Sequence, residues 1–161
     1  MAEIAGAPRA PREVRVAVLV SRYNEVVTTR LLEGARQCLR ERSVPDARVD
    51  VIWVPGAFEL AVAAEAAAAS GRYAALVALG CVIRGETPHF EYVAGEATRG
   101  LGNVALAHRL PIGFGVLTTE NLDQALARAG GAAGNKGYEA AEAALITADV
   151  LAQLTRAAPR D

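Results

Sequence analysis

Four short apolar runs, separated by longer helical patterns, constrain the fold of this chain more than any other feature. The first run, VRVAVLV at residues 14–20, is β-branched and almost continuously apolar, as a parallel strand covered on both faces should be. Between the runs, apolar residues recur at helical spacing. The alternation predicts an α/β fold, with helices on both faces of a four-stranded parallel sheet. The expected strands are residues 14–20, 49–54, 74–79 and 112–117, and the expected helices are residues 26–42, 58–70, 88–108, 121–129 and 136–154.

The 161 residues fit a single domain with a buried core. We expect residues 13–156 to form that domain, residues 1–12 to form a flexible N-terminal arm, and residues 157–161 to form a C-terminal tail. The predicted arm carries Ala, Pro and Arg but no apolar h-region, so it does not resemble a signal peptide.

Charge and cysteine content argue against several classes of function. The 17 basic and 18 acidic side chains nearly cancel, which argues against nucleic acid or an anionic membrane as a partner. No apolar stretch approaches the roughly 20 residues of a membrane span. The 2 cysteines form no disulfide framework and no Cys/His cluster has zinc spacing, so we expect no metal site and a reducing cytoplasm.

The hydrophobic content of 52% comes largely from alanine, since aromatic residues make up only 5% of the chain. Small side chains on helices allow close packing, and a single layer of helices over a sheet cannot use all of them. The composition therefore favours an oligomer.

The loops that follow the strands carry the most distinctive sequence. In a sheet of this kind, ligands bind outside the carboxyl ends of the strands. Four unusual loops fall at that edge, at residues 21–24, 55–59, 81–89 and 113–119. We therefore expect them to assemble the binding site.

The segment GCVIRGETPHF, residues 80–90, is the strongest candidate for chemistry. Thr87 is expected to cap a helix whose first residue is Pro88, which places His89 in the first helical turn. Unpaired N–H groups at such a turn favour an anion, and the loop glycine permits close backbone approach. The amides of Glu86 and Thr87 can hold a phosphate beside the imidazole.

Three other loop residues each allow a structural and a functional interpretation. Tyr23 follows the first strand, where its ring either anchors the next helix or stacks on a planar ligand. Glu59, beside Phe58, either suits the first turn of a helix or accepts hydrogen bonds from substrate hydroxyls. Phe114 lies between two glycines, which indicates core packing or a close approach by a ligand or a neighbour.

Basic residues raise a similar choice. His108 falls late in the helix that His89 begins, where solvation or C-terminal capping is the simpler role, so we favour His89 for proton transfer. Arg128 and Lys136 flank a Gly-rich loop, and either cation can be solvated. A lysine that starts a helix opposes the macrodipole, and an anionic partner is one reason for it.

Six motifs in order carry a family resemblance: SRYN, WVPGAFE, GCVIRGETPHFEYV, FGVLTTEN, ARAG and GNKG. They resemble the 6,7-dimethyl-8-ribityllumazine synthase family, and the resemblance covers about residues 14–154. The resemblance implies a flavodoxin-like αβα sandwich and a transferase that catalyses the penultimate step of riboflavin biosynthesis. It condenses 5-amino-6-(D-ribitylamino)uracil with 3,4-dihydroxy-2-butanone 4-phosphate, releasing phosphate and water, and it uses no cofactor.

The resemblance also implies how the ring substrate is held. Tyr23 takes the place of an aromatic that stacks on the pyrimidine, although the family usually has Phe or Trp there. Glu59 would accept hydrogen bonds from the ribityl hydroxyls, in a segment that holds the ribityl chain and the ring. The matching segments are Ala57, Phe58 and Glu59, and then Cys81, Val82 and Ile83, whose backbone reads the ring edge.

For the second substrate, the resemblance implies that Glu86 and Thr87 belong to the phosphate-side loop and that His89 is the general acid/base. Two residues would come from the adjacent subunit, Phe114 as an aromatic contact and Arg128 as the phosphate-binding arginine. Lys136 corresponds to a second basic residue near that site.

A site shared between subunits requires an oligomer. The resemblance implies pentamers, which occur free, paired face to face, or assembled into an icosahedral shell of about sixty subunits. The short connection AGGAAGNKG around residues 130–136 resembles that of shell-forming members, so we expect the shell, with riboflavin synthase as a further partner.

Three alternatives remain at this stage. A riboflavin synthase of the archaeal type resembles this family and binds similar ligands. A catalytically silent, flavin-binding shell protein would keep the fold after its site had decayed. A generic phosphate-binding regulatory domain would account for the loop at residues 84–89 but not for six ordered motifs.

Overall fold

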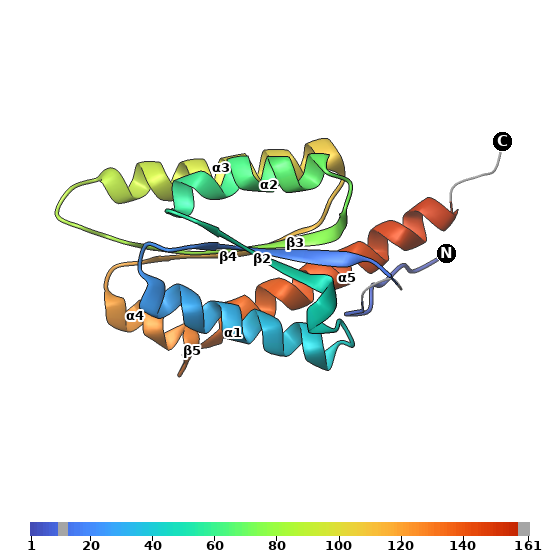
Figure 1. Cartoon of the computed structure of the whole chain (residues 1–161), viewed down its shortest axis with the longest axis horizontal. Helices are drawn as coiled ribbons and strands as arrows, with labels where there is room; N and C mark the ends of the chain where they lie inside the picture. Colours follow the sequence, from blue (N-terminus) through green and yellow to red (C-terminus); the bar gives the residue numbers. More distant parts are fainter. Residues whose placement is uncertain (10–12, 158–161) are drawn as a thin grey trace.

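The computed structural model describes residues 1–9 and 13–157, so residues 10–12 of the predicted arm and 158–161 of the predicted tail lie outside the described residues. Four parallel strands form one sheet in the order β2-β1-β3-β4 (Figure 1). This architecture confirms the α/β class and the parallel sheet with helices on both sides. The strands are β1 (Arg15–Ser21), β2 (Val49–Val54), β3 (Tyr73–Ile83) and β4 (Ile112–Thr119).

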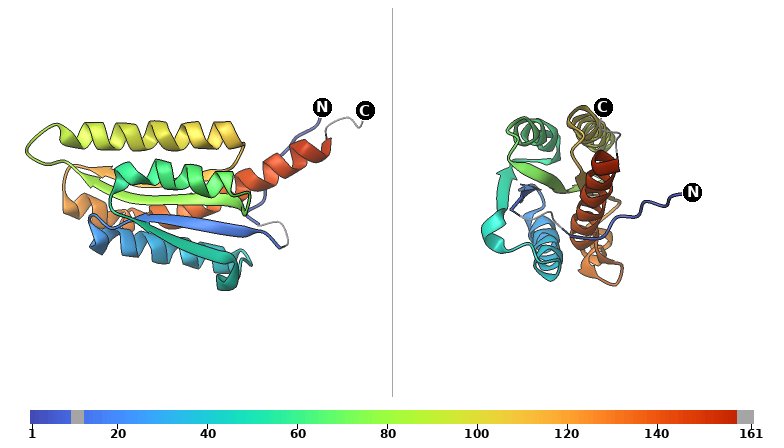
Figure 2. Two further views of the ribbon diagram at one scale, coloured as in Figure 1. Left: turned by 45° about the horizontal axis from the view of Figure 1, so that its top comes forward. Right: turned by 90° about the vertical axis from the view of Figure 1, so that its right-hand side faces the viewer.

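Helices cover both faces of this sheet, as the flavodoxin-like sandwich requires (Figures 1 and 2). Helices α2 (Leu60–Ala69) and α3 (His89–His108) lie on one face. Helices α1 (Glu25–Glu41), α4 (Leu122–Ala127) and α5 (Lys136–Ala157) lie on the other.

The apolar run of β1 supplies both of the resulting cores. Because side chains alternate across a strand, Val16, Val18 and Val20 pack toward α1 and α5, while Ala17 and Leu19 pack toward α2. All five are at most 1% exposed. A continuous apolar run is therefore needed here, whereas a strand with one wet face would alternate polar and apolar residues.

Strand β3 is longer than the sequence pattern predicts. We expected it to end at Leu79, but it continues to Ile83 because residues 80–83 pair with residues 116–119 of β4. Cys81 and Val82 are thus buried strand residues and not part of a loop. The pairing with β1, in contrast, ends at Leu79.

The start of α3 differs by one residue from the prediction. Pro88 is the N-cap, His89 is the first helical residue, and Thr87 makes no capping hydrogen bond, so the predicted Thr87 cap is wrong. The carbonyl of Pro88 accepts a hydrogen bond from the Glu91 N–H at 3.0 Å, which begins the helix one residue later than expected.

Short elements complete the chain. The 3₁₀ turns η1 (Asp46–Arg48) and η2 (Ala57–Glu59) precede β2 and α2. The Gly-rich segment predicted as a loop contains a two-stranded hairpin, β5 (Ala129–Gly131) and β6 (Gly134–Asn135).

Residues 5–9 of the N-terminal arm lie against α5. The N–H of Ala7 donates to the Asp149 carboxylate at 3.0 Å, and Arg9 Nε lies 3.3 Å from the same group. Gln153 Nε2 donates to the Ala5 carbonyl at 2.9 Å. Chiefly through the Ala7 N–H, these contacts hold the pKa of Asp149 below its ordinary value.

Candidate active site

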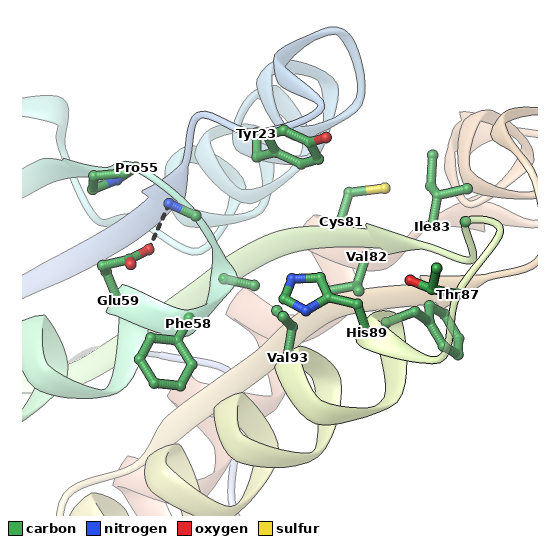
Figure 3. Close-up of a pocket in the computed structure, with 14 residues that line it drawn as sticks. Tyr23, Pro55, Phe58, Glu59, Cys81, Val82, Ile83, Thr87, His89 and Val93 are labelled. Atoms are coloured by element: carbon green, nitrogen blue, oxygen red, sulfur yellow. Dashed lines mark hydrogen bonds between the residues drawn. The ribbon is translucent and has the colours of Figure 1, made fainter.

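A pocket of about 530 Å³ opens at the carboxyl edge of the sheet, where the sequence predicts a site (Figure 3). It lies between the β1–α1 loop, the turn before α2, the end of β3 and the first turns of α3. Its lining residues are Tyr23, Pro55, Gly56, Ala57, Phe58, Glu59, Cys81, Val82, Ile83, Gly85, Thr87, His89, Phe90 and Val93.

The β1–α1 loop forms one wall. The N–H of Arg22 donates to the Val54 carbonyl at 2.9 Å, and the N–H of Tyr23 donates to the Pro55 carbonyl at 3.0 Å. These two bonds continue the β1–β2 pairing beyond the sheet and fix the loop to the turn before α2. Tyr23 is 75% exposed, so its side chain packs on little of its own chain and is free to contact a ligand.

Glu59 is held by the turn that it ends. Its Oε2 accepts a hydrogen bond from the Gly56 N–H at 2.9 Å, which fixes the carboxylate at the pocket wall. Within the described residues, no hydrogen bond uses the other carboxylate oxygen. Because a carboxylate only accepts, this oxygen suits hydroxyl groups of a ligand. Phe58 lies next to it and is 57% exposed.

The end of β3 forms the floor and offers backbone groups. Since β1 stops pairing at Leu79, no strand of the described chain pairs with this edge of β3 beyond that residue, and the Asn24 side chain bonds only the Cys81 carbonyl there. The N–H of Arg84 donates to Thr119 of β4 at 2.9 Å, so the even-numbered residues here face β4. Because backbone groups point to alternate sides along a strand, Ile83 directs its N–H and carbonyl toward the open edge.

Cys81 also lies in this floor and is 2% exposed. Burial raises the pKa of its thiol to about 11. The thiol is therefore protonated at neutral pH, and a neutral buried thiol is a poor nucleophile. Its contribution to the pocket is shape and backbone position.

His89 lies near the middle of the lining residues (Figure 3). Val82 lies beside it, and the turn that carries Phe58 and Glu59 lies across the pocket from it. As the first residue of α3 it is exposed to the pocket. His108 lies at the other end of that helix, where its Nε2 is 2.9 Å from Oε1 of Glu65. The two histidines thus separate into one pocket residue and one helix-pairing residue.

Five lining residues were not among the predicted site residues: Pro55, Gly56 and Gly85, which lie in the predicted loops, and Phe90 and Val93, which lie beyond them. Val93 is one helical turn after His89, and helical spacing from the histidine would have found it. Phe90 is covered by the Arg84 guanidinium, which lies 4.7 Å from the ring centroid. Arg84 Nε also lies 2.8 Å from Oε2 of Glu120, so this cation ties the loop at residues 84–88 to the segment after β4.

Four residues predicted for the site do not line the pocket of this single chain: Glu86, Phe114, Arg128 and Lys136. Glu86 lies in the loop beside the pocket, between the lining residues Gly85 and Thr87. Arg128 ends α4, where its Nη1 donates to the Gln124 carbonyl at 3.0 Å.

Lys136 and Phe114 also have surroundings within the chain. Lys136 Nζ pairs with Oε2 of Glu139 at 2.8 Å, a carboxylate in the same helical turn. Phe114 is 48% exposed on β4, the edge strand. A side chain at Gly113 would collide with the Ala140 carbonyl. The absence of a side chain at this position therefore lets α5 pack closely against β4.

Among the described residues, no three His, Cys, Asp or Glu side chains group as metal ligands would. The polar groups of the pocket are the Glu59 carboxylate, the His89 imidazole, the hydroxyls of Tyr23 and Thr87, the Cys81 thiol and the open backbone edge.

Comparisons with known proteins agree with one another. The profile of the family described as 6,7-dimethyl-8-ribityllumazine synthase matches residues 13–152. A 6,7-dimethyl-8-ribityllumazine synthase of Edwardsiella ictaluri (strain 93-146) is 53% identical over 152 residues, which cover 94% of this chain and 97% of that relative.

Proposed function

The chain belongs to the 6,7-dimethyl-8-ribityllumazine synthase family, and from this membership we propose how its pocket serves the transferase activity of riboflavin biosynthesis. The reaction condenses 5-amino-6-(D-ribitylamino)uracil with 3,4-dihydroxy-2-butanone 4-phosphate. The observation that carries the proposal is one pocket that combines an open strand edge, a carboxylate with an unused oxygen, and a histidine.

The ring substrate occupies the part of the pocket between Tyr23 and β3. Its pyrimidine stacks on the exposed Tyr23 ring, and its polar edge pairs with the backbone of Ile83. The ribityl chain extends toward the turn before α2, where the unused oxygen of Glu59 accepts from its hydroxyls. This arrangement is supported by the pocket lining, in which the Tyr23 loop, the turn that carries Glu59 and the end of β3 border one cavity.

The butanone phosphate lies on the other side of His89, by the loop at residues 84–88. The ring amine attacks the ketone to give a carbinolamine and then an imine, phosphate leaves, and ring closure releases water. Each of these steps moves a proton near the two reactants, and His89 is the pocket residue suited to do so. Holding the two reactants together contributes much of the acceleration.

Loss of phosphate needs a cation, and the described lining of the pocket contains neither lysine nor arginine. We propose that Arg128 of an adjacent subunit supplies it, that Phe114 of that subunit closes the ring site, and that Lys136 adds a second positive charge near it. Exposed apolar side chains support association, among them Phe114, Val62 and Leu106, the last being 81% exposed.

A site shared between subunits requires an oligomer. We propose pentamers that build an icosahedral shell of about sixty subunits in the cytoplasm, with riboflavin synthase as a partner. Light scattering tests the shell, because a mass near five chains would rule it out. In the described part of the chain, no helix combines the length and the apolar character needed to cross a membrane.

The activity is tested by supplying both precursors and following the lumazine product by absorbance. His89→Ala is expected to lower kcat about 100-fold without abolishing turnover. Arg128→Ala is expected to be more damaging, about 1000-fold, because it removes charge stabilisation of the leaving phosphate. Full activity of Arg128→Ala would overturn its assigned role, and riboflavin formation from lumazine alone would instead indicate the riboflavin synthase alternative.

Mixing the two variants tests the shared site directly. If His89 and Arg128 of one site come from different subunits, unfolding the two variants together and reassembling them restores about a quarter of the wild-type sites. Each variant reassembled alone is the control and stays impaired. If both residues belonged to one chain, the mixture would show only the average of the two impaired activities.

A further inference from the structure

We propose that Asn24 is a positioning residue, whose side chain fixes the Tyr23 loop relative to the end of β3, the two parts of the pocket that hold the ring substrate. The inference rests on the proposed pocket, and it concerns a residue that does not line it. Asn24 lies between Tyr23 and the first turn of α1.

The backbone of Asn24 is in the left-handed region, with φ 60° and ψ 47°. Only glycine and, less readily, asparagine and aspartate adopt this conformation at little cost. The turn lets the carbonyl of Asn24 accept from the N–H groups of Val27 at 2.9 Å and Thr28 at 3.1 Å. A glycine would suit this backbone at least as well, so helix initiation alone does not require the amide side chain.

The side chain of Asn24 makes a long-range contact. Its Nδ2 donates to the Cys81 carbonyl at 2.9 Å. The last β1–β3 partners are Val20 and Leu79, so the Cys81 carbonyl lies just beyond the end of that pairing. At this position β1 no longer pairs with β3, and the Asn24 amide supplies the hydrogen-bond donor in its place. The bond satisfies the carbonyl of a buried residue.

The loop is thereby attached on both sides. The N–H of Tyr23 joins it to Pro55, on the side of the turn that carries Glu59, and Asn24 joins it to β3. Without the second bond, the Tyr23 ring keeps its attachment to one wall but loses its attachment to the floor. The backbone of Ile83, two residues from the bonded carbonyl, loses a fixed position relative to the same ring.

Three variants separate the side-chain tether from the backbone turn. Asn24→Gly keeps the left-handed turn and removes the amide, and Asn24→Asp keeps the size but sets a carboxylate against the Cys81 carbonyl. Ser43→Gly is the matched control, because Ser43 also has a positive φ, 65°, and is exposed at the far end of α1. Steady-state assays give KM for each precursor and kcat, and thermal unfolding reports the fold.

Asn24→Gly is expected to raise KM for the ribitylaminouracil about tenfold, the ratio equivalent to one hydrogen bond, and to change KM for the butanone phosphate less than about twofold. Asn24→Asp is expected to raise the first KM further, and Ser43→Gly to change neither. An Asn24→Gly enzyme with both KM values unchanged, or with both raised equally, overturns the positioning role whatever its stability.

Glu59→Gln distinguishes this failure from a failure of the pocket assignment. If Glu59→Gln raises KM for the ribitylaminouracil while Asn24→Gly does not, the pocket stands and the tether is refuted. If neither variant moves that KM, the ring substrate binds elsewhere and the proposed pocket is refuted with it.

Discussion

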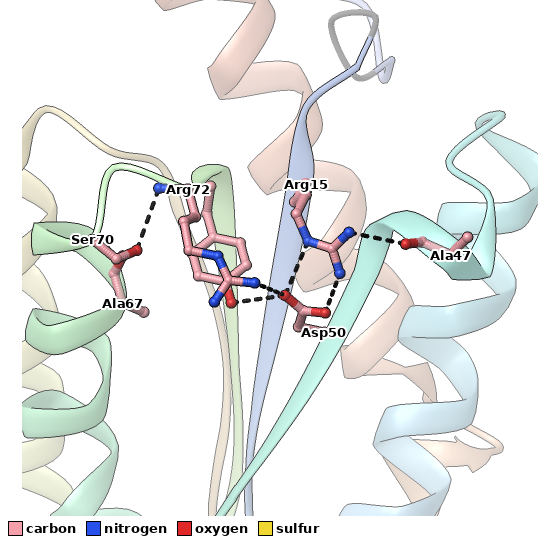
Figure 4. A network of polar contacts seen from close by, with 7 residues as sticks. Arg15, Ala47, Asp50, Ala67, Ser70 and Arg72 are labelled. Carbon is pink, nitrogen blue, oxygen red and sulfur yellow. Dashed lines mark hydrogen bonds and ion pairs between the residues drawn. The ribbon is translucent and has the colours of Figure 1, made fainter.

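Replacing Asp50 by asparagine should destabilise the fold without touching the active site. Asp50 lies where β1, β2 and β3 begin, at the edge of the sheet opposite the pocket (Figure 4). Its carboxylate accepts from two nitrogens of Arg15 and, at 2.8 Å, from the hydroxyl of Tyr73. Arg72 lies 3.4 Å away as a second cation. One carboxylate therefore joins the starts of three strands.

The expected cost follows from the exposure of these groups. A hydrogen bond to a charged group contributes about 1.5–3 kcal/mol when shielded, and an exposed ion pair about 0.2–1 kcal/mol. The side chains of Asp50 and Arg15 are 27% and 33% exposed, between those limits. An asparagine keeps one acceptor but turns an NH₂ group toward a guanidinium, so we expect a loss of about 2 kcal/mol.

Asp46→Asn is the matched control. Asp46 pairs with Arg40 at 3.1 Å, but their side chains are 69% and 51% exposed, so the loss should stay below about 0.5 kcal/mol. Urea unfolding followed by circular dichroism measures both variants at one fixed protein concentration, because an assembled chain unfolds in a concentration-dependent way. If Asp50→Asn costs no more than Asp46→Asn, the reasoning is refuted. KM values unchanged from wild type would show that the pocket is intact.

The pH dependence supplies a second check on Asp50. Its hydrogen bonds, first from Arg15 and then from Tyr73, hold its pKa below the ordinary value. A lowered pKa in the folded state means that the stabilisation is present above the unfolded pKa of about 3.9 and is lost as pH falls through the folded value. The difference between wild type and Asp50→Asn should therefore be constant near neutral pH and narrow below about pH 4.

Two further predictions concern packing and thiol reactivity. In Gly113→Ala the new Cβ would lie 2.0 Å from the Ala140 carbonyl oxygen, so α5 must shift, and we expect a loss of more than about 3 kcal/mol in urea unfolding. Gly102→Ala, a helical position with nothing within 4 Å, is the control and should be neutral or slightly stabilising; equal stability of the two would contradict the account. Burial raises the pKa of both Cys38 and Cys81 to about 11, so iodoacetamide at neutral pH should label neither in the folded protein and both in urea. Rapid labelling of Cys81 before unfolding would show that the pocket floor is open to reagents.

The fold class and the edge that carries the pocket were both predictable from the sequence. The apolar runs require a sheet covered on both faces, and the connections between them require parallel strands. In such a sheet the loops at residues 21–24, 55–59 and 81–89 must reach the same edge, and the pocket is lined from all three. The roles of the individual residues stay predictions until the variants are assayed.

Local pattern was a poorer guide where a neighbouring strand decides the outcome. The sequence pattern predicted that the third strand ends at Leu79. In the structure β3 continues to Ile83, because residues 80–83 pair with residues of β4. The glycine at position 113 indicated some close approach, but only the packed structure identifies α5 as the neighbour. Phe90 lines the pocket, and the Arg84 guanidinium stacks on its ring, a contact that the local sequence pattern did not predict.

The sequence by itself determined the order of strands and helices, the sheet edge where the pocket forms, and the kinds of side chain available there. These depend on periodicity and on capping and turn residues, which act over a few neighbours along the chain. The tertiary structure decided which groups meet, such as the Asn24 amide and the Cys81 carbonyl, 57 residues apart. That contact depends on where β1 stops pairing with β3, and such a register is set by the packing of the whole sheet.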